Sequence, residues 1–93
     1  MIARTVVIGT PLGLHARPAA RFVQAVADTG LDVTITRDGR TVNAAGILGV
    51  MSLDVNGGDT VTLTVDDNGR DDIADVAGRL DALAALLATN LDA

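Results

Sequence analysis

The chain has 93 residues, a formal net charge of −5 and no cysteine, and its length and composition predict one domain over residues 1–93. It has one histidine, one serine (Ser52), and no lysine, tyrosine, tryptophan or glutamate. This inventory excludes disulfides, thiolate catalysis, Schiff bases and multi-histidine metal sites, so we expect no metal and no cofactor. With 12 acidic against 7 basic residues, a nucleic acid is not expected as a partner, because binding it requires a basic face.

Targeting and membrane segments are not expected either. No segment has the ~20 apolar residues that would span a bilayer. The N-terminal residues MIARTVVIG lack the apolar stretch and cleavage site of a secretory signal. We therefore expect a cytoplasmic protein with no membrane partner.

The first half of the chain predicts a strand, a helix and a hairpin. Residues 2–8 place apolar side chains at a period of two and predict a strand, which a loop over residues 9–13 follows. A helix is predicted next, ending before Gly30, because apolar residues recur at helical spacing. These residues are Ala19, Phe22, Val23 and Val26. Two short alternating segments, residues 33–36 and 41–42, flank Asp38-Gly39, a pair that favours a tight hairpin turn.

The second half predicts a short helix, a strand and a long helix. Residues 46–53 are too apolar and too irregular for a strand, and we expect a two-turn helix there. After a turn at residues 56–59, valine and leucine alternate with threonine over residues 60–65, which is typical of a strand. A helical apolar stripe from Ile73 to Leu87 follows, with Asp71 and Asp72 expected in its first turn.

The predicted order of elements is β-α-β-β-α-β-α. The central hairpin excludes a fully parallel sheet. Four strands with one polar face, and three helices to cover the other face, indicate an α+β domain of two layers.

The most informative segment for function is GLHARPAA, residues 13–20. His15 lies where a loop meets the first turn of a helix, and Pro18 is tolerated there because first-turn amides have no intrahelical partner. Such a helix N-terminus binds anions, and the guanidinium of Arg17 suits phosphate oxygens. Imidazole is a good transient phosphoryl acceptor. On its own, however, the position also fits a loop histidine without chemistry beside a solvated arginine.

A second feature is an apolar cluster on the predicted two-turn helix. At helical spacing, Val50 and Leu53 face the core while Ile47, Leu48 and Met51 point elsewhere. Exposed apolar residues of this kind often mark a docking surface. The alternative is that all five are core residues of a small domain.

Two other motifs carry less weight. The aspartate-rich residues 66–72 lack the bidentate acid at the twelfth position of a calcium loop, so a solvated turn followed by a helix cap is favoured. Ser52 lies in an apolar run without a nucleophile elbow, which argues against a serine hydrolase.

The sequence GLHARPA at residues 13–19 closely resembles the active-site motif of HPr, the histidine-containing phosphocarrier of the sugar phosphotransferase system. A second stretch, VNAAGILGVMSL at residues 42–53, resembles the other signature of the family. The predicted order of elements also fits from about residue 2 to residue 87, so the resemblance covers nearly the whole chain.

The resemblance implies an open-faced β-sandwich, with a four-stranded antiparallel sheet covered on one face by three helices. It implies that enzyme I, charged by phosphoenolpyruvate, phosphorylates His15 on Nδ1, and that the group then passes to IIA-type domains. The chain would be a covalent intermediate rather than a free-standing enzyme, and a monomer suits its successive docking. Arg17 would contact the phosphoryl group. The family's docking surface would comprise Ala16, Ala20, Ile47, Leu48 and Met51.

One position departs from the family pattern. Many members have a serine, phosphorylated by a regulatory kinase, where this chain has Gly46, and the neighbouring Ala45 has no hydroxyl either. We therefore expect that this regulation is absent.

Several functions remain open at this stage. Within the carrier class, the chain could serve a nitrogen-regulatory branch or a dihydroxyacetone kinase, since these carriers share the histidine motif. In a different class, it could be an interaction or regulatory module in which His15 is never phosphorylated.

Overall fold

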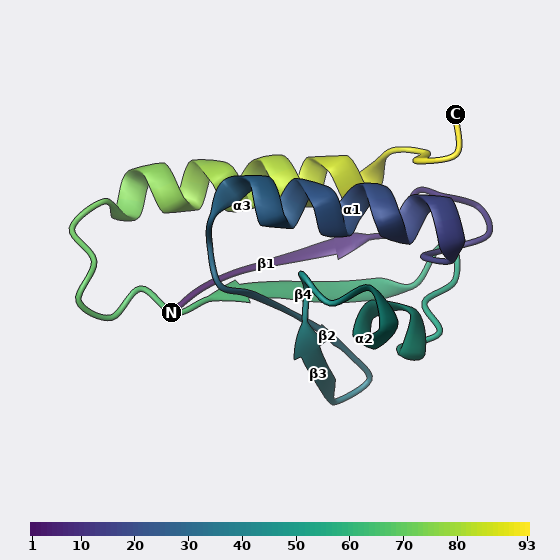
Figure 1. Ribbon diagram of the computed structural model, residues 1–93, viewed down its shortest axis with the longest axis horizontal. Helices are drawn as coiled ribbons and strands as arrows, with labels where there is room; N and C mark the ends of the chain where they lie inside the picture. Colours follow the sequence, from purple (N-terminus) through teal and green to yellow (C-terminus); the bar gives the residue numbers. More distant parts are fainter.

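The computed structural model describes residues 1–93 and has the predicted order of strands and helices (Figure 1). The elements are β1 (Ile2–Val7), α1 (Ala16–Thr29), β2 (Val33–Arg37), β3 (Arg40–Asn43), α2 (Ile47–Ser52), β4 (Thr60–Val65) and α3 (Ile73–Ala88).

The four strands form one antiparallel sheet in the order β1-β4-β2-β3. The last strand in sequence, β4, lies between β1 and β2, so Leu63 pairs with Arg4 on one side and with Ile35 on the other. The β2–β3 hairpin turns at Asp38 and Gly39, whose φ angles of 50° and 80° are the positive values that the turn requires. The expected antiparallel α+β architecture is confirmed.

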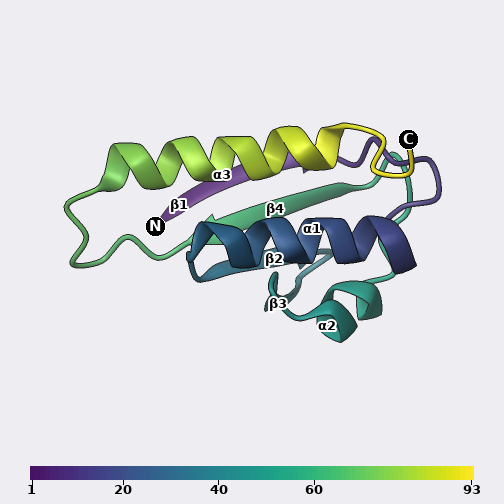
Figure 2. The same ribbon diagram turned by 45° about the horizontal axis from the view of Figure 1, so that its top comes forward.

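The helices cover one face of this sheet. Helices α1 and α3 lie side by side across it, and the shorter α2 lies beside α1 on the side away from α3 (Figures 1 and 2). The opposite face is open and carries a row of threonines, one from each strand. They are Thr5, Thr62, Thr36 and Thr41, which are paired across neighbouring strands.

The core lies between the sheet and the helices. Phe22, the only aromatic residue of the chain, is fully buried on α1 and packs within a cluster to which α3 contributes Leu80 and Leu87. Ile35 and Leu63 bring the sheet into the same cluster. None of the helices combines the length and the apolar composition needed to cross a bilayer.

Two details at helix ends refine the predictions. Gly46 has an extended backbone, with φ −99° and ψ 109°, and is the N-cap of α2 rather than a residue inside the helix. The expectation that Asp71 and Asp72 lie in the first turn of α3 is wrong, since Asp72 is the N-cap and the acidic residue of the first turn is Asp75. The carboxylate of Asp72 accepts two hydrogen bonds of 2.8 Å from Arg70 instead of capping the helix.

Candidate functional site

His15 is the N-cap residue of α1. Its backbone is extended, with φ −113° and ψ 167°, and its carbonyl accepts the first hydrogen bond of the helix from Ala19 at 3.1 Å. The imidazole makes no capping hydrogen bond, and the side chain is 48% exposed. The ring is therefore free to react with a group that approaches from solvent.

The loop before His15 is held by tight backbone contacts. The N–H of Leu14 donates to the carbonyl of Val55 at 3.0 Å, and the Leu14 side chain is buried. Gly13 has φ 81°, and a Cβ atom there would lie only 1.9 Å from the Val55 oxygen. Because glycine alone allows this approach, the loop presents His15 from a fixed position.

The first turn of α1 exposes backbone donors beside the imidazole. The N–H groups of Ala16 and Arg17 have no acceptor within the chain, and Pro18 has no N–H. Ala16 has φ 20°, an unusual value for the first residue of a right-handed helix. Unpaired donors at the positive end of a helix dipole favour an anion at this place.

Arg17 is the only one of the seven arginines that makes no hydrogen bond or ion pair within the chain. Its neighbour Arg21, by contrast, donates to the carbonyl of Leu91 at 2.9 Å. Both line a shallow groove of about 530 Å³ between α1 and the C-terminal end of α3, which also contains Ala20. The guanidinium of Arg17, which lies two residues after His15 in the first turn of α1, is thus available to an anion.

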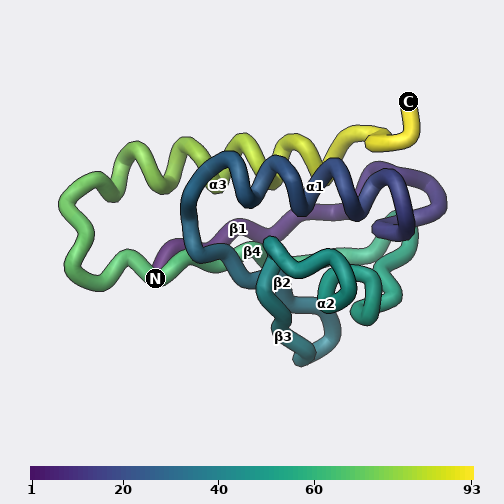
Figure 3. The backbone as a smooth tube through the Cα atoms, in the orientation of Figure 1, coloured from purple at the N-terminus to yellow at the C-terminus, as the bar shows by residue number.

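The C-terminal tail, residues 89–93, brings a carboxylate to the site that the sequence did not indicate. Oδ2 of Asp92 lies 3.9 Å from Nε2 of His15. Leu91, which precedes Asp92, is buried. It is the one large apolar residue after Leu87, and it is the only feature of the sequence that could have indicated that the tail packs against the core. Figures 1 and 3 show the tail and the loop before α1 at the same end of the molecule.

Helix α2 presents an apolar surface made by Ile47, Leu48 and Met51, whose side chains are exposed. Val50 and Leu53 are buried beneath them, as the helical spacing predicts. On the neighbouring helix, Ala16 and Ala20 are also exposed. Because α2 lies beside α1 (Figure 2), the expected docking residues come from two adjacent helices.

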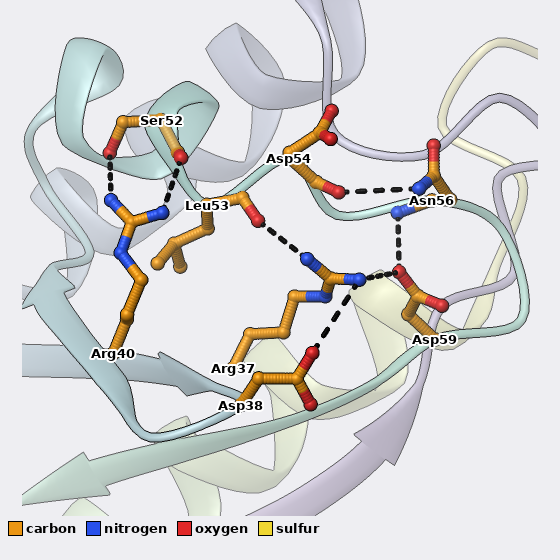
Figure 4. A network of polar contacts seen from close by, with 8 residues as sticks. All are labelled: Arg37, Asp38, Arg40, Ser52, Leu53, Asp54, Asn56 and Asp59. Carbon is orange, nitrogen blue, oxygen red and sulfur yellow. Dashed lines mark hydrogen bonds and ion pairs between the residues drawn. The ribbon is translucent and has the colours of Figure 1, made fainter.

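Two arginines of the β2–β3 hairpin fix the end of α2 (Figure 4). Arg37 donates to the carbonyl of Leu53 at 2.9 Å and forms an ion pair of 3.1 Å with Asp59. Arg40 donates to the carbonyl of Ser52 at 2.9 Å. Positive side chains at these carbonyls complement the negative end of a helix. The Ser52 hydroxyl donates to the Gly49 carbonyl at 2.6 Å, as expected for an ordinary helix residue.

Comparison with known protein families identifies one match. Residues 2–89 match the family described as "PTS HPr component phosphorylation site". The chain is 42% identical over 93 residues to the phosphocarrier protein HPr of Streptomyces coelicolor, an alignment that covers 99% of this chain and 94% of that protein. It is 41% identical over 68 residues to the HPr-like protein Crh of Halalkalibacterium halodurans, which covers 73% of this chain and 81% of that protein.

Among solved structures, the chain is similar to the phosphocarrier protein HPr of Bacillus anthracis. The TM-score is 0.74 and the sequences are 38% identical, over 92% of this chain and 95% of that one.

Proposed function

This chain belongs to the HPr family of phosphotransferase-system phosphocarriers, and from that premise we propose that His15 accepts a phosphoryl group from enzyme I and passes it to IIA-type domains. The observation that carries the proposal is the state of two side chains at the start of α1. The imidazole of His15 is half exposed and engaged in no capping bond, and Arg17 is the one arginine without a partner.

The chemistry assigned to this chain is a single displacement at phosphorus. The lone pair of His15 Nδ1 forms a bond to phosphorus, and the electron pair of the bond between phosphorus and the donor returns to the donor. Catalysis of phosphoryl transfer consists mostly of positioning and charge stabilisation. The Arg17 guanidinium and the unpaired N–H groups of Ala16 and Arg17 supply donors for the phosphoryl oxygens. Transfer to the acceptor is the same displacement in reverse.

Partner recognition is assigned to the apolar surface on α2 together with α1. Ile47, Leu48 and Met51 are exposed apolar side chains, which a partner would cover. Ala16 and Ala20 are small, and they allow a partner's backbone to approach the imidazole closely. One surface next to one histidine suits donor and acceptor in turn, and for this reason we propose that the chain acts as a monomer.

The test is the intact mass of the purified chain after incubation with enzyme I, magnesium and phosphoenolpyruvate. We expect one added phosphoryl group, which brief acid treatment removes because the phosphorus–nitrogen bond is acid-labile. The His15→Ala variant should gain no mass while keeping its fold, since the side chain makes no capping bond. A phosphoryl group that survives acid, or one that appears on His15→Ala, would contradict the proposal.

A regulatory interaction module is the second candidate, and the similarity to HPr-like protein Crh favours it. In this function the apolar surface on α2 binds a partner and His15 is never phosphorylated. The same experiment separates the two candidates. No added mass, with an enzyme I of proven activity on another carrier, would favour the module.

A separate experiment determines which acceptor the chain serves. The phosphorylated chain is offered to IIA domains of sugar permeases, to a nitrogen-regulatory IIA domain and to a dihydroxyacetone kinase. Sugar permease domains are the proposed acceptors. We also propose that regulation by seryl phosphorylation is absent, because Gly46 and Ala45 have no hydroxyl. A seryl-phosphorylated product after treatment with such a kinase and ATP would overturn that proposal.

A further inference from the structure

We propose that Asp92, in the C-terminal tail, is a positioning residue for His15, whose carboxylate holds the ring proton on Nε2 and leaves Nδ1 as the nucleophile. This inference rests on the proposed function for its consequence in phosphoryl transfer. The observation behind it is the distance of 3.9 Å between Oδ2 of Asp92 and Nε2 of His15. No other carboxylate lies within 4.0 Å of the imidazole.

The tail is built into the fold at the residue before Asp92. Leu91 is 4% exposed and belongs to the core cluster. Its N–H donates to the Thr10 hydroxyl at 2.9 Å, and its carbonyl accepts from Arg21 at 2.9 Å. Thr10 is fully buried, and it lies in the same loop that leads to His15. The tail and the histidine loop are therefore attached to each other.

The residues after Leu91 turn back on Asn90. The N–H of Asp92 donates to the Asn90 side chain at 3.0 Å, and the N–H of Ala93 donates to the Asn90 carbonyl at 3.2 Å. This turn fixes the backbone from which the Asp92 side chain extends. Its side chain is 35% exposed, and it lies beside an imidazole that is 48% exposed. At 3.9 Å the carboxylate acts on Nε2–H in the free chain through its charge, and the pair can tighten to a hydrogen bond when the site is occupied, as is common for contacts that are long in a free protein.

The consequence for the ring follows from the chemistry of imidazole. In the neutral ring one nitrogen carries the proton and the other carries the lone pair, and a hydrogen bond at one nitrogen determines which is which. The negative charge of a carboxylate beside Nε2, and its capacity to accept a hydrogen bond from Nε2–H, favour a proton on that nitrogen and leave the lone pair on Nδ1. When Nδ1 attacks phosphorus, the proton stays on Nε2 and the ring becomes positive. The Asp92 carboxylate then stabilises that charge from the edge of the ring away from the incoming phosphoryl group.

The first measurement is the tautomer of His15, read from the nitrogen-15 chemical shifts of its ring. Because His15 is the only histidine, selective labelling gives one pair of signals. The spectra are recorded in the alkaline range where the two ring signals no longer change with pH, so that only the neutral ring is observed. We expect the Nε2–H form to dominate in the unchanged chain and to be less populated in Asp92→Asn. In Asp92→Glu, which keeps a carboxylate, it should recover.

The second measurement is the rate at which enzyme I phosphorylates each variant, followed by intact mass at limiting enzyme I. We expect Asp92→Asn to be slower by about threefold, the size typical of a partly exposed charge pair, and Asp92→Glu to regain most of the loss. Asp71→Asn is the matched control, since it removes the same charge from the β4–α3 loop at the opposite end of the molecule (Figure 1). This control variant should leave the tautomer populations of His15 and the rate of its phosphorylation unchanged.

The two measurements separate this inference from the proposed function. The tautomer measurement needs no enzyme I, so it tests the Asp92 contact even if the chain is never phosphorylated. If the unchanged chain is phosphorylated while Asp92→Asn shows the same tautomer populations or the same rate, the inference is overturned and the proposed function stands. A loss of rate in Asp71→Asn equal to that in Asp92→Asn would also overturn it, because a general charge effect would then explain both.

Discussion

The backbone N–H of Leu91 donates a hydrogen bond of 2.9 Å to the hydroxyl of Thr10, which lies 81 residues earlier in the chain. The same hydroxyl donates to the carbonyl of Thr89 at 3.3 Å. One buried oxygen therefore joins the tail to the loop that carries the histidine.

Replacing Thr10 by valine should test that connection. Valine keeps the shape but leaves the Leu91 N–H and the Thr89 carbonyl without a partner, so we expect the free energy of unfolding to fall by about 1–3 kcal/mol. Thr10→Ser keeps the hydroxyl and should lose only about 1 kcal/mol for the buried methyl group. Urea unfolding of the three proteins measures both losses. A valine variant as stable as the serine variant would mean that the two hydrogen bonds contribute nothing.

Gly13→Ala should be severely destabilising, and Gly69→Ala is its matched control. Both glycines have positive φ angles, 81° and 74°, so each alanine bears a conformational penalty of about 1 kcal/mol. Only at Gly13 would the new Cβ also meet the Val55 oxygen, at 1.9 Å, while nothing lies within 4 Å at Gly69. We expect Gly13→Ala to lower the free energy of unfolding by about 3 kcal/mol or more. Thermal unfolding measures both variants. If Gly13→Ala and Gly69→Ala lost the same unfolding free energy, the loop around Gly13 would have to move freely enough to accept the Cβ atom.

Arg17→Gln should slow phosphorylation of His15 without changing stability. The guanidinium makes no hydrogen bond or ion pair within the chain, so the free energy of unfolding should change by no more than about 0.5 kcal/mol. Loss of a charged donor to the phosphoryl group should reduce the rate by about tenfold to a hundredfold. Arg79→Gln removes a charge from α3, where Arg79 pairs with Asp75, and should leave the rate unchanged. Similar rates in both variants would argue against a role for Arg17.

Leu48→Asp should weaken binding to enzyme I and leave the fold intact. Leu48 is 80% exposed, so the folded chain loses almost no buried surface. A charge in an apolar interface should raise the dissociation constant by about tenfold or more, measured by titration calorimetry. Ile73→Asp, an exposed apolar residue at the start of α3, is the control and should bind normally. Normal binding by Leu48→Asp would place the interface elsewhere.

Asp72→Asn should reduce the dependence of stability on acidic pH. The hydrogen bonds from Arg70 lower the pKa of Asp72 below its ordinary value of 3.8. A carboxyl group with a lowered pKa stabilises the fold fully above its unfolded pKa, and this contribution disappears as the pH falls through the folded pKa. Asparagine can still serve as the N-cap.

The difference in urea midpoint between the unchanged chain and Asp72→Asn should therefore be constant above about pH 5 and shrink below about pH 4. Asp71→Asn is the control, because Asp71 is an exposed neighbour that forms no ion pair. If the urea midpoints of the unchanged chain and of Asp72→Asn fell in parallel down to the lowest pH, the prediction would be contradicted.

Local sequence patterns were sufficient to predict most of the helices, strands and turns. The alternation of residues 60–65, the Asp38-Gly39 turn and the apolar spacing of Phe22 and Val26 each depend on neighbours in sequence. The helical spacing of α2 also separated the buried Val50 and Leu53 from the exposed Leu48. The placement of Asp71 and Asp72 in the first turn of α3 was wrong because the helix begins only at Ile73, and the contact with Arg70 explains why the carboxylate of Asp72 makes no capping bond.

The sequence by itself therefore determined the order of the elements, the antiparallel α+β class and the location of His15 and Arg17 at a helix start. Only the tertiary structure decided that β4 lies between β1 and β2, and that the tail brings Asp92 to Nε2 of His15. The reason is the range of the interactions. Periodicity and turn chemistry act over a few residues, whereas the contact between Leu91 and Thr10 joins the two ends of the chain and exists only once the core has formed.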